Sequence, residues 1–225
     1  MADIDLEAQD SIKFASIESL VSGIQTKGLA LARPGLYIAT SAYPEDTRDE
    51  PLSQAHNVLK KLTSKDAISE ARLAELTEYL QGRTLVDLGA GKTTNGYQIA
   101  RMCGAKGYVA IEANHFSELR NVLGKIRSTN SGKMPVCVVG EDMRDFVKRI
   151  PDGSVAVFAF NIDEYILNKM PMTDMEQLKQ NISRILASGS AYIGSSTSIP
   201  VSGLREIDRY DPPYDPGYYI IRIKS

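Results

Sequence analysis

The stretch that most constrains the fold of this chain runs from Thr84 to Gly96. It opens with apolar side chains that leave little surface for water, as in a buried strand: Leu85, Val86 and Leu88. Gly89 and Gly91 then turn the chain, and a helical pattern begins near Asn95. A strand, a glycine turn and a helix in this order place free backbone N–H groups at the carboxyl end of a parallel strand. The stretch therefore predicts an α/β fold with a ligand site at this turn.

Two binding motifs compete for the turn. Gly91-Lys92-Thr93 matches the end of a phosphate-binding P-loop, but Val86 stands where that motif requires its first glycine. The carboxylate of Asp87 would also face bound phosphates unfavourably. The string Asp87-Leu88-Gly89-Ala90-Gly91 instead resembles the acid-x-Gly-x-Gly motif of the Rossmann-like S-adenosylmethionine-dependent methyltransferases, with Thr93 in place of a frequent third glycine. A cationic sulfonium ligand tolerates the acid that a triphosphate would not, so we favour the methyltransferase motif.

A second acid, Glu112, ends the next predicted strand, which begins at Tyr108. It follows the glycine turn by about 20 residues, the distance at which a Rossmann-type fold places an acid on the ribose hydroxyls of its ligand. The alternative is a strand-end carboxylate that merely meets solvent. Because the acid and the glycine turn occur together at this spacing, we expect one cofactor to contact the set Asp87, Gly89, Gly91 and Glu112.

A third segment, from Gly140 to Phe146, follows the strand predicted from Pro135 to Val139. It is similar to the G-D-x-x-D/E segment that holds the adenine in these methyltransferases, with Glu141 as an extra acid. The resemblance implies that Asp142 accepts a hydrogen bond from the exocyclic amine and that Met143 offers its backbone N–H and an apolar side. Alternatively, Asp142 simply begins the following helix, whose first turn favours an acid.

With three motifs in order and spacing, the chain from Thr84 to Gly194 resembles the class I S-adenosylmethionine-dependent methyltransferases. Strands and helices alternate along this part, which is typical of a parallel sheet covered on both faces. The resemblance implies an α/β, doubly wound, mostly parallel sheet of seven strands with one antiparallel strand. A terminal hairpin, predicted at Leu204 to Arg209 and Tyr218 to Lys224, would supply the last two strands. We therefore expect a Rossmann-like cofactor-binding domain over residues 81–225.

Residues 1–80 are expected to form a helical cap or extension joined to that domain. The spacing of apolar residues predicts helices at Ser16 to Ala32, Pro51 to Leu62 and Lys65 to Leu80. An extended segment after the first of these carries Tyr37 and Tyr43. These two tyrosines would roof the substrate, or would serve as ordinary packing.

The segment after the fourth predicted strand of the domain, Asn161-Ile162-Asp163-Glu164-Tyr165, bears on the substrate class. In the family's nucleobase and amide methylating branches a [DN]-P-P-[YF] tetrapeptide stands here, and this chain lacks its prolines. Asp211-Pro212-Pro213-Tyr214 matches the tetrapeptide, but it falls after the fifth strand and is predicted to be a hairpin turn. Methylation of nucleobase amines is therefore disfavoured, and a small molecule or a protein side chain is expected as substrate.

The implied mechanism is an in-line displacement at the sulfonium methyl by a nucleophile of the substrate. Much of the catalysis in such transfers comes from holding the two partners in line, with a base only where the nucleophile loses a proton. The resemblance places three side chains beside the methyl group as catalytic candidates: Asn161, Asp163 and Tyr165.

Two other functions compete with this one. The missing third glycine and the missing tetrapeptide suggest a cofactor-binding protein that has the fold but no turnover. An apolar strand ending in acids, at Phe158 to Glu164, suggests a nucleotide hydrolase. Without the first P-loop glycine, the hydrolase is the more remote of the two.

The composition disfavours several classes of partner. A net charge of -2 over 225 residues gives no electrostatic footprint for nucleic acid or an acidic membrane, and no apolar run is long enough to span a bilayer. Cys103 and Cys137 lie far apart in apolar surroundings, which indicates reduced thiols and a cytoplasmic protein. His56 and His115 share no ligand spacing with cysteines or acids, so no metal site is expected. The sequence carries no signal for the oligomeric state.

Overall fold

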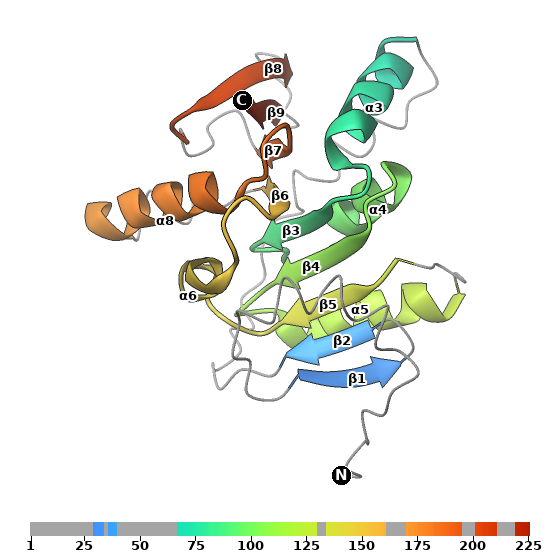
Figure 1. Cartoon of the computed structure of the whole chain (residues 1–225). Helices are drawn as coiled ribbons and strands as arrows, with labels where there is room; N and C mark the ends of the chain where they lie inside the picture. Colours follow the sequence, from blue (N-terminus) through green and yellow to red (C-terminus); the bar gives the residue numbers. More distant parts are fainter. Residues whose placement is uncertain are drawn as a thin grey trace.

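Figure 1 shows the computed structural model, in which a central sheet carries helices on both faces. The structure describes residues 29–33, 36–39, 67–129, 134–160, 170–194, 201–210 and 219–225. Its helices are α3 (Ala67–Leu80), α4 (Asn95–Met102), α5 (Phe116–Thr129), α6 (Met143–Phe146), the 3-10 helix η1 (Val147–Arg149) and α8 (Met172–Ile185). Its strands are β1 (Leu29–Arg33), β2 (Leu36–Ala39), β3 (Thr84–Leu88), β4 (Gly107–Ile111), β5 (Val136–Val139), β6 (Val155–Ala159), β7 (Ala191–Gly194), β8 (Leu204–Tyr210) and β9 (Tyr219–Lys224). None of these helices is both long and apolar enough to cross a membrane.

The strands form one sheet in the order β1-β2-β5-β4-β3-β6-β7-β9-β8. From β2 to β7 neighbouring strands are parallel, whereas β9 is antiparallel to both β7 and β8. The seven strands from β5 to β8 confirm the expected doubly wound, mostly parallel sheet with one antiparallel strand. Because β4 and β6 flank β3 and lead the chain away in opposite directions, the carboxyl end of β3 lies at the topological switch point, where open α/β sheets bind ligands.

The core consists of two apolar layers, one on each face of the sheet. Helices α6 and α8 with η1 cover one face, and α3, α4 and α5 cover the other. Successive residues of β3 point to opposite faces of the sheet, so Val86 packs in the first layer and Leu85 in the second. Every residue of β3, β4, β5 and β6 is buried, as is typical of central parallel strands that helices cover on both faces.

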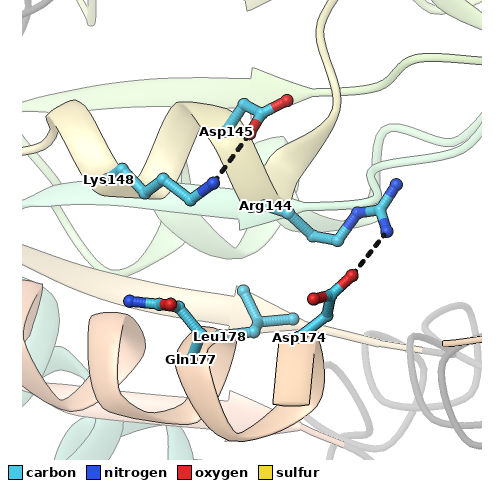
Figure 2. A pocket seen from close by; sticks show the side chains of 6 residues that line it. All are labelled: Arg144, Asp145, Lys148, Asp174, Gln177 and Leu178. Carbon is cyan, nitrogen blue, oxygen red and sulfur yellow. Dashed lines mark hydrogen bonds and ion pairs between the residues drawn. The ribbon is translucent and has the colours of Figure 1, made fainter. Parts of the chain in front are cut away.

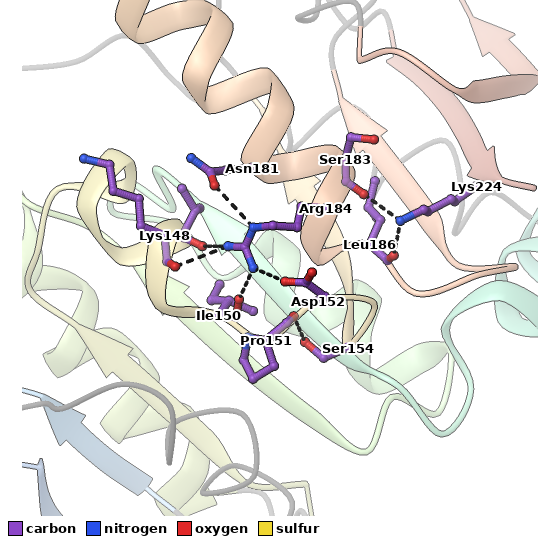
Figure 3. A network of polar contacts seen from close by, with 11 residues as sticks. Lys148, Ile150, Pro151, Asp152, Ser154, Asn181, Ser183, Arg184, Leu186 and Lys224 are labelled. Carbon is purple, nitrogen blue, oxygen red and sulfur yellow. Dashed lines mark hydrogen bonds and ion pairs between the residues drawn. The ribbon is translucent and has the colours of Figure 1, made fainter.

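Two cations fasten α8 to its surroundings, as Figure 3 shows. The Arg184 guanidinium donates hydrogen bonds to the backbone oxygens of Val147 and Ile150, each at 2.8 Å. The Lys224 ammonium donates to the backbone oxygen of Ser183 at 2.7 Å and to that of Leu186 at 3.0 Å. Both cations therefore donate to backbone carbonyl groups at or near the ends of η1 and α8, and the position of Lys224 also suits the dipole of α8.

The N-terminal part differs from the sequence-based expectation. Residues Leu29–Arg33 form strand β1, whereas the spacing predicted a helix through Ala32. That helix prediction is wrong at its carboxyl end, because pairing of β1 with β2, and of β2 with β5, outweighs local helix propensity. The extended segment predicted next is confirmed as β2, and the helix predicted from Lys65 is confirmed as α3. The helix predicted from Pro51 to Leu62 lies outside the described residues.

Candidate functional site

The glycine turn follows directly from the end of β3. Gly89 and Gly91 have φ values of +65° and +59°, which place both in the left-handed region that glycine alone adopts without strain. The N–H of Ala90 between them donates to the backbone oxygen of Ile111 at 3.0 Å, so the turn is fixed to the carboxyl end of β4. Gly89 is exposed. The turn thus presents an exposed backbone surface at the switch point, in front of the N-terminus of α4.

This geometry argues against a P-loop. The first glycine of that motif would fall at position 86, and Val86 is a fully buried residue in the middle of β3. The strand therefore continues through the place where the phosphate-binding loop would have to begin.

Glu112 connects the ends of three strands. Its side chain is 7% exposed, so the alternative of a carboxylate that meets solvent is wrong. One carboxylate oxygen accepts from the N–H of Gly91 at 2.8 Å, and the other accepts from the N–H groups of Asn114 at 2.8 Å and His115 at 3.1 Å. Its own N–H donates to the backbone oxygen of Val139 on β5 at 2.9 Å. Because a carboxylate has about four acceptor positions, the described residues leave one that could accept from a ligand hydroxyl.

Asp87 lies behind the glycine turn and is only 3% exposed. The Tyr108 hydroxyl donates to its Oδ2 atom at 2.5 Å. The pKa of Asp87 is raised to about 7: burial is the largest cause, the Tyr108 hydrogen bond lowers the pKa in part, and the negative charge of Glu112 contributes to the rise. The sequence did not reveal Tyr108 as part of the site, since its hydroxyl meets Asp87 only through the register that pairs it with Leu85.

Asp142 occupies the N-cap position of α6 and is bound by Arg144. Its Oδ1 accepts from the backbone N–H of Arg144 at 2.8 Å and from the Nε of the same residue at 2.9 Å. Burial alone would raise the pKa of Asp142, but the hydrogen bonds from Arg144 outweigh it and hold the pKa below its ordinary value. The structure thus shows the helix-start role that the sequence left open. Met143 follows at the first position of α6, half-buried against the core, and adenine contact by either residue stays a prediction.

A small cavity of about 160 Å³ lies between α6, η1 and α8, as Figure 2 shows. Its lining is Arg144, Asp145, Lys148, Asp174, Gln177 and Leu178. Each cation in it is already paired, Lys148 with Asp145 at 2.9 Å and Arg144 with Asp174 at 3.6 Å. It is smaller than typical small-molecule pockets, which measure about 300–1,000 Å³, and the glycine turn contributes nothing to it. We therefore place the candidate site at the turn and not in this cavity.

The remaining predicted site residues are described only in part or not at all. Asn161, Asp163, Tyr165 and Tyr43 lie outside the described residues. The described segment before them ends at Phe160, directly after β6. Because β6 is parallel to β3, this point and the glycine turn both lie at the carboxyl ends of the strands. Tyr37 lies in β2 opposite Cys137, and its predicted contact with substrate stays untested.

Among the described residues, no cluster of three histidine, cysteine or acidic side chains is arranged to hold a metal ion. The two cysteines are free thiols in the core, and burial raises the pKa of Cys103 to about 11 and that of Cys137 to about 12. Neither thiol is therefore ionised at neutral pH, whereas a nucleophilic or metal-binding cysteine must be a thiolate.

Solved structures of methyltransferases share this arrangement of strands and helices. The "putative methylase HI0767" from Haemophilus influenzae is 14% identical and superposes with a TM-score of 0.50 over 70% of this chain and 96% of its own. The fold is that of a class I methyltransferase. The bifunctional kinase-methyltransferase WbdD, 11% identical, superposes with a TM-score of 0.50 over 68% of this chain and 40% of its own. No family model matches the sequence, and neither does any curated protein.

Proposed function

We propose that this chain is an S-adenosylmethionine-dependent methyltransferase that acts on a small molecule or a protein side chain. One observation carries the proposal: a left-handed glycine turn and two buried acids, Asp87 and Glu112, meet at the switch point of a methyltransferase-fold sheet. The methyltransferase-fold neighbours support the same class of cofactor.

The residues at the turn fit this cofactor. Its sulfonium and ammonium groups are cationic. Asp87 and Glu112, whose carboxyl groups lie close enough to interact electrostatically, place acidic groups behind the turn. The remaining acceptor position of Glu112 suits a ribose hydroxyl. The exposed Gly89 allows a ligand to approach the backbone closely. A polyphosphate, by contrast, would meet two acids.

When bound, this cofactor supplies an electrophilic methyl group on sulfur. The contributions of the chain are binding and positioning: Glu112 would hold the ribose, and Asp142 and Met143 would border the adenine. Asn161, Asp163 and Tyr165 would hold the acceptor atom in line with the methyl group, and the Asp163 carboxylate would receive its proton where it has one to lose.

A cofactor-binding protein without turnover is the second candidate. Its support is that all the hydrogen bonds described for the Asp142 carboxylate come from Arg144, and that Thr93 replaces the third glycine of the motif. The two candidates share the cofactor and differ only in whether a methyl group leaves it.

The cofactor assignment is tested by thermal shift with S-adenosylhomocysteine, ATP with magnesium, and NAD, since a ligand that binds the native state raises its stability. We expect a shift with S-adenosylhomocysteine alone. Gly91→Val should abolish it. The matched control is Gly153→Val, because Gly153 has the same φ of +59° in an open turn remote from the site. Equal shifts in both variants would contradict the assignment of the turn.

The acceptor side is tested with alanine variants of Asn161, Asp163 and Tyr165 and with isotopically labelled cofactor. Affinity for S-adenosylhomocysteine should stay within about tenfold of the wild type. Methyl transfer should fall by roughly a hundredfold or more in at least one variant, the usual scale for a lost positioning or acid–base group. A protein without turnover would show no transfer to any acceptor, and full transfer in all three variants would move the acceptor elsewhere.

A further inference from the structure

The pair formed by Asp87 and Tyr108 is more deeply buried than a ligand contact needs to be. Tyr108 is fully buried and Asp87 is 3% exposed. The tyrosine belongs to β4 and pairs with Leu85, two positions before Asp87, so its side chain runs along the sheet toward the carboxyl edge. Its hydroxyl then donates to Asp87 at 2.5 Å. The pair thus stands directly behind the glycine turn, out of contact with bulk water.

The N-terminus of α4 closes the space around the pair. A Cβ on Gly96 would come within 2.2 Å of Oδ2 of Asp87 and 3.0 Å of the Tyr108 hydroxyl. The backbone of Tyr97 hydrogen-bonds to that hydroxyl. The position of the carboxyl group is therefore fixed from two sides, by β4 and by the helix.

Among the described residues, two titratable side chains act on Asp87: Tyr108 in β4, and Glu112, which directly follows β4. From α4 it faces Gly96 at the helix N-terminus, and the Tyr97 ring lies against that of Tyr108. On the β6 side its neighbour in the sheet is the apolar Phe158. Burial raises the pKa of Asp87 to about 7, so its charge changes across the physiological range. The pKa of Tyr108 is raised well above its ordinary value by burial and by Asp87, so the hydroxyl keeps its proton.

We propose that the buried Asp87–Tyr108 pair makes the site distinguish the positively charged methyl donor from its demethylated product, by holding a carboxyl group in a fixed position directly behind the turn. This inference rests on the proposed function. S-adenosylmethionine carries one more positive charge than S-adenosylhomocysteine, and the two otherwise share the same groups. Only the ionised carboxylate attracts that extra charge.

The attraction has a definite size and direction. Opposite unit charges within one site, at an effective dielectric constant of about 20, change a binding constant on the order of tenfold. Donor binding then favours release of the Asp87 proton to solvent, by linkage. Affinity for the donor rises with pH more steeply than affinity for the product, which lacks the sulfonium charge. Once that charge is gone, Asp87 takes up a proton from solvent more readily, and the product is held less tightly than the donor was.

The test is calorimetric titration of the protein with S-adenosylmethionine and with S-adenosylhomocysteine from pH 5.5 to 8.5. In the wild type the ratio of donor to product affinity should rise about tenfold across this range. Donor binding near pH 7 should release a fraction of a proton, measured by repeating the titration in buffers of different ionisation enthalpy. Product binding should release less. Asp87→Asn should abolish the rise in the affinity ratio and the difference in proton release. Any pH dependence that this variant keeps measures the titration of the ligand's own amine.

Two tyrosine variants distinguish the effect of the Asp87–Tyr108 hydrogen bond from that of removing any buried hydroxyl nearby. Tyr108→Phe removes the hydrogen bond that lowers the pKa of Asp87, so the rise in donor affinity should move to higher pH. Tyr97→Phe is the matched control. Its hydroxyl is buried in the same core, with its ring against that of Tyr108, and has no hydrogen-bond partner among the described residues. This variant should leave the rise where it is in the wild type.

The possible failures are distinguishable. If neither ligand binds the wild type, the proposed function and this inference both fall. If both ligands bind with the same pH dependence, or if Tyr108→Phe and Tyr97→Phe give the same profile, only the role of the pair is refuted. Should Asp87→Asn fail to fold, the comparison of the two tyrosine variants decides alone.

Discussion

Replacing Gly96 with alanine tests how tightly the N-terminus of α4 packs on the buried acid. Alanine is normally the better helix residue by about 1 kcal/mol, and Gly96 lies in the first turn of α4. Here, however, the new Cβ would come within 2.2 Å of Oδ2 of Asp87 and 3.0 Å of its Cγ. Real Cβ atoms do not approach oxygen so closely, so either the helix or the carboxyl group must move.

The expected cost follows from these distances. Overpacking of a dense core costs about 1–3 kcal/mol, and disturbing a buried hydrogen bond to a charged group costs about 1.5–3 kcal/mol. After the gain in helix propensity, Gly96→Ala should lower the free energy of unfolding by about 2–4 kcal/mol. Urea unfolding followed by far-UV circular dichroism measures this change, because the chain has no tryptophan for fluorescence.

A double-mutant cycle identifies the cause. An Asp87→Ala background removes the two Asp87 atoms nearest to the added Cβ and leaves the Tyr108 hydroxyl at 3.0 Å. Gly96→Ala should therefore cost about 1–3 kcal/mol less there than in the wild type. A Gly96→Ala protein that is as stable as the wild type, or more stable, would refute the packing described for this helix. Equal costs in the two backgrounds would show that Asp87 is not the obstacle.

Three further predictions concern stability and binding. Because the folded protein keeps the Asp87 proton up to a pKa of about 7, whereas the ordinary value is 3.8, the free energy of unfolding should fall by up to about 4 kcal/mol as pH rises between these values. Asp87→Asn should lack this decline in urea titrations across the range. Arg184→Met, which removes the guanidinium hydrogen bonds to the carbonyls of Val147 and Ile150, should cost about 2–4 kcal/mol in thermal or urea unfolding. Arg101→Met, at an exposed position in α4, should stay within about 0.5 kcal/mol of the wild type. Glu112→Ala should weaken binding of S-adenosylhomocysteine by about 1.5–3 kcal/mol in calorimetry, with Glu112→Gln milder, and wild-type affinity in both would remove Glu112 from the site.

The parts of the fold that the sequence predicted are those encoded over short distances. The buried strand β3, the turn at Gly89 and Gly91, and the start of α4 are all local: apolar residues, glycines and helical spacing occur within a dozen positions. The alternation that follows and the antiparallel terminal hairpin are predicted for the same reason. Pattern and propensity agree in these elements, so the sequence identifies them.

The parts that escaped prediction depend on register and on distant partners. Tyr108 meets Asp87 because β3 and β4, two strands separated by helix α4, align in one particular register, which no local pattern specifies. Asp142 is followed closely by Arg144, and the sequence alone did not show that this arginine would engage it. The sequence predicted a helix where strand β1 lies, because β1 pairs with β2 and β2 in turn pairs with the distant strand β5. The local sequence contains no signal for this pairing.

Strand β2 has a consequence for how the chain reaches its native state. Leu36 pairs with Val136, so the two strands are separated by 100 residues (136 minus 36). Closing so long a loop is costly in chain entropy, and contacts of this separation slow folding. During synthesis on the ribosome, β2 emerges long before β5 exists, and must wait unpaired while β3 and β4 are made. We expect pulse-labelled hydrogen exchange to show the amides of β2 protected after those of β3 and β4. The segment that is translated early is thus incorporated late, and until it docks, β5 is an open sheet edge that can pair with another nascent chain.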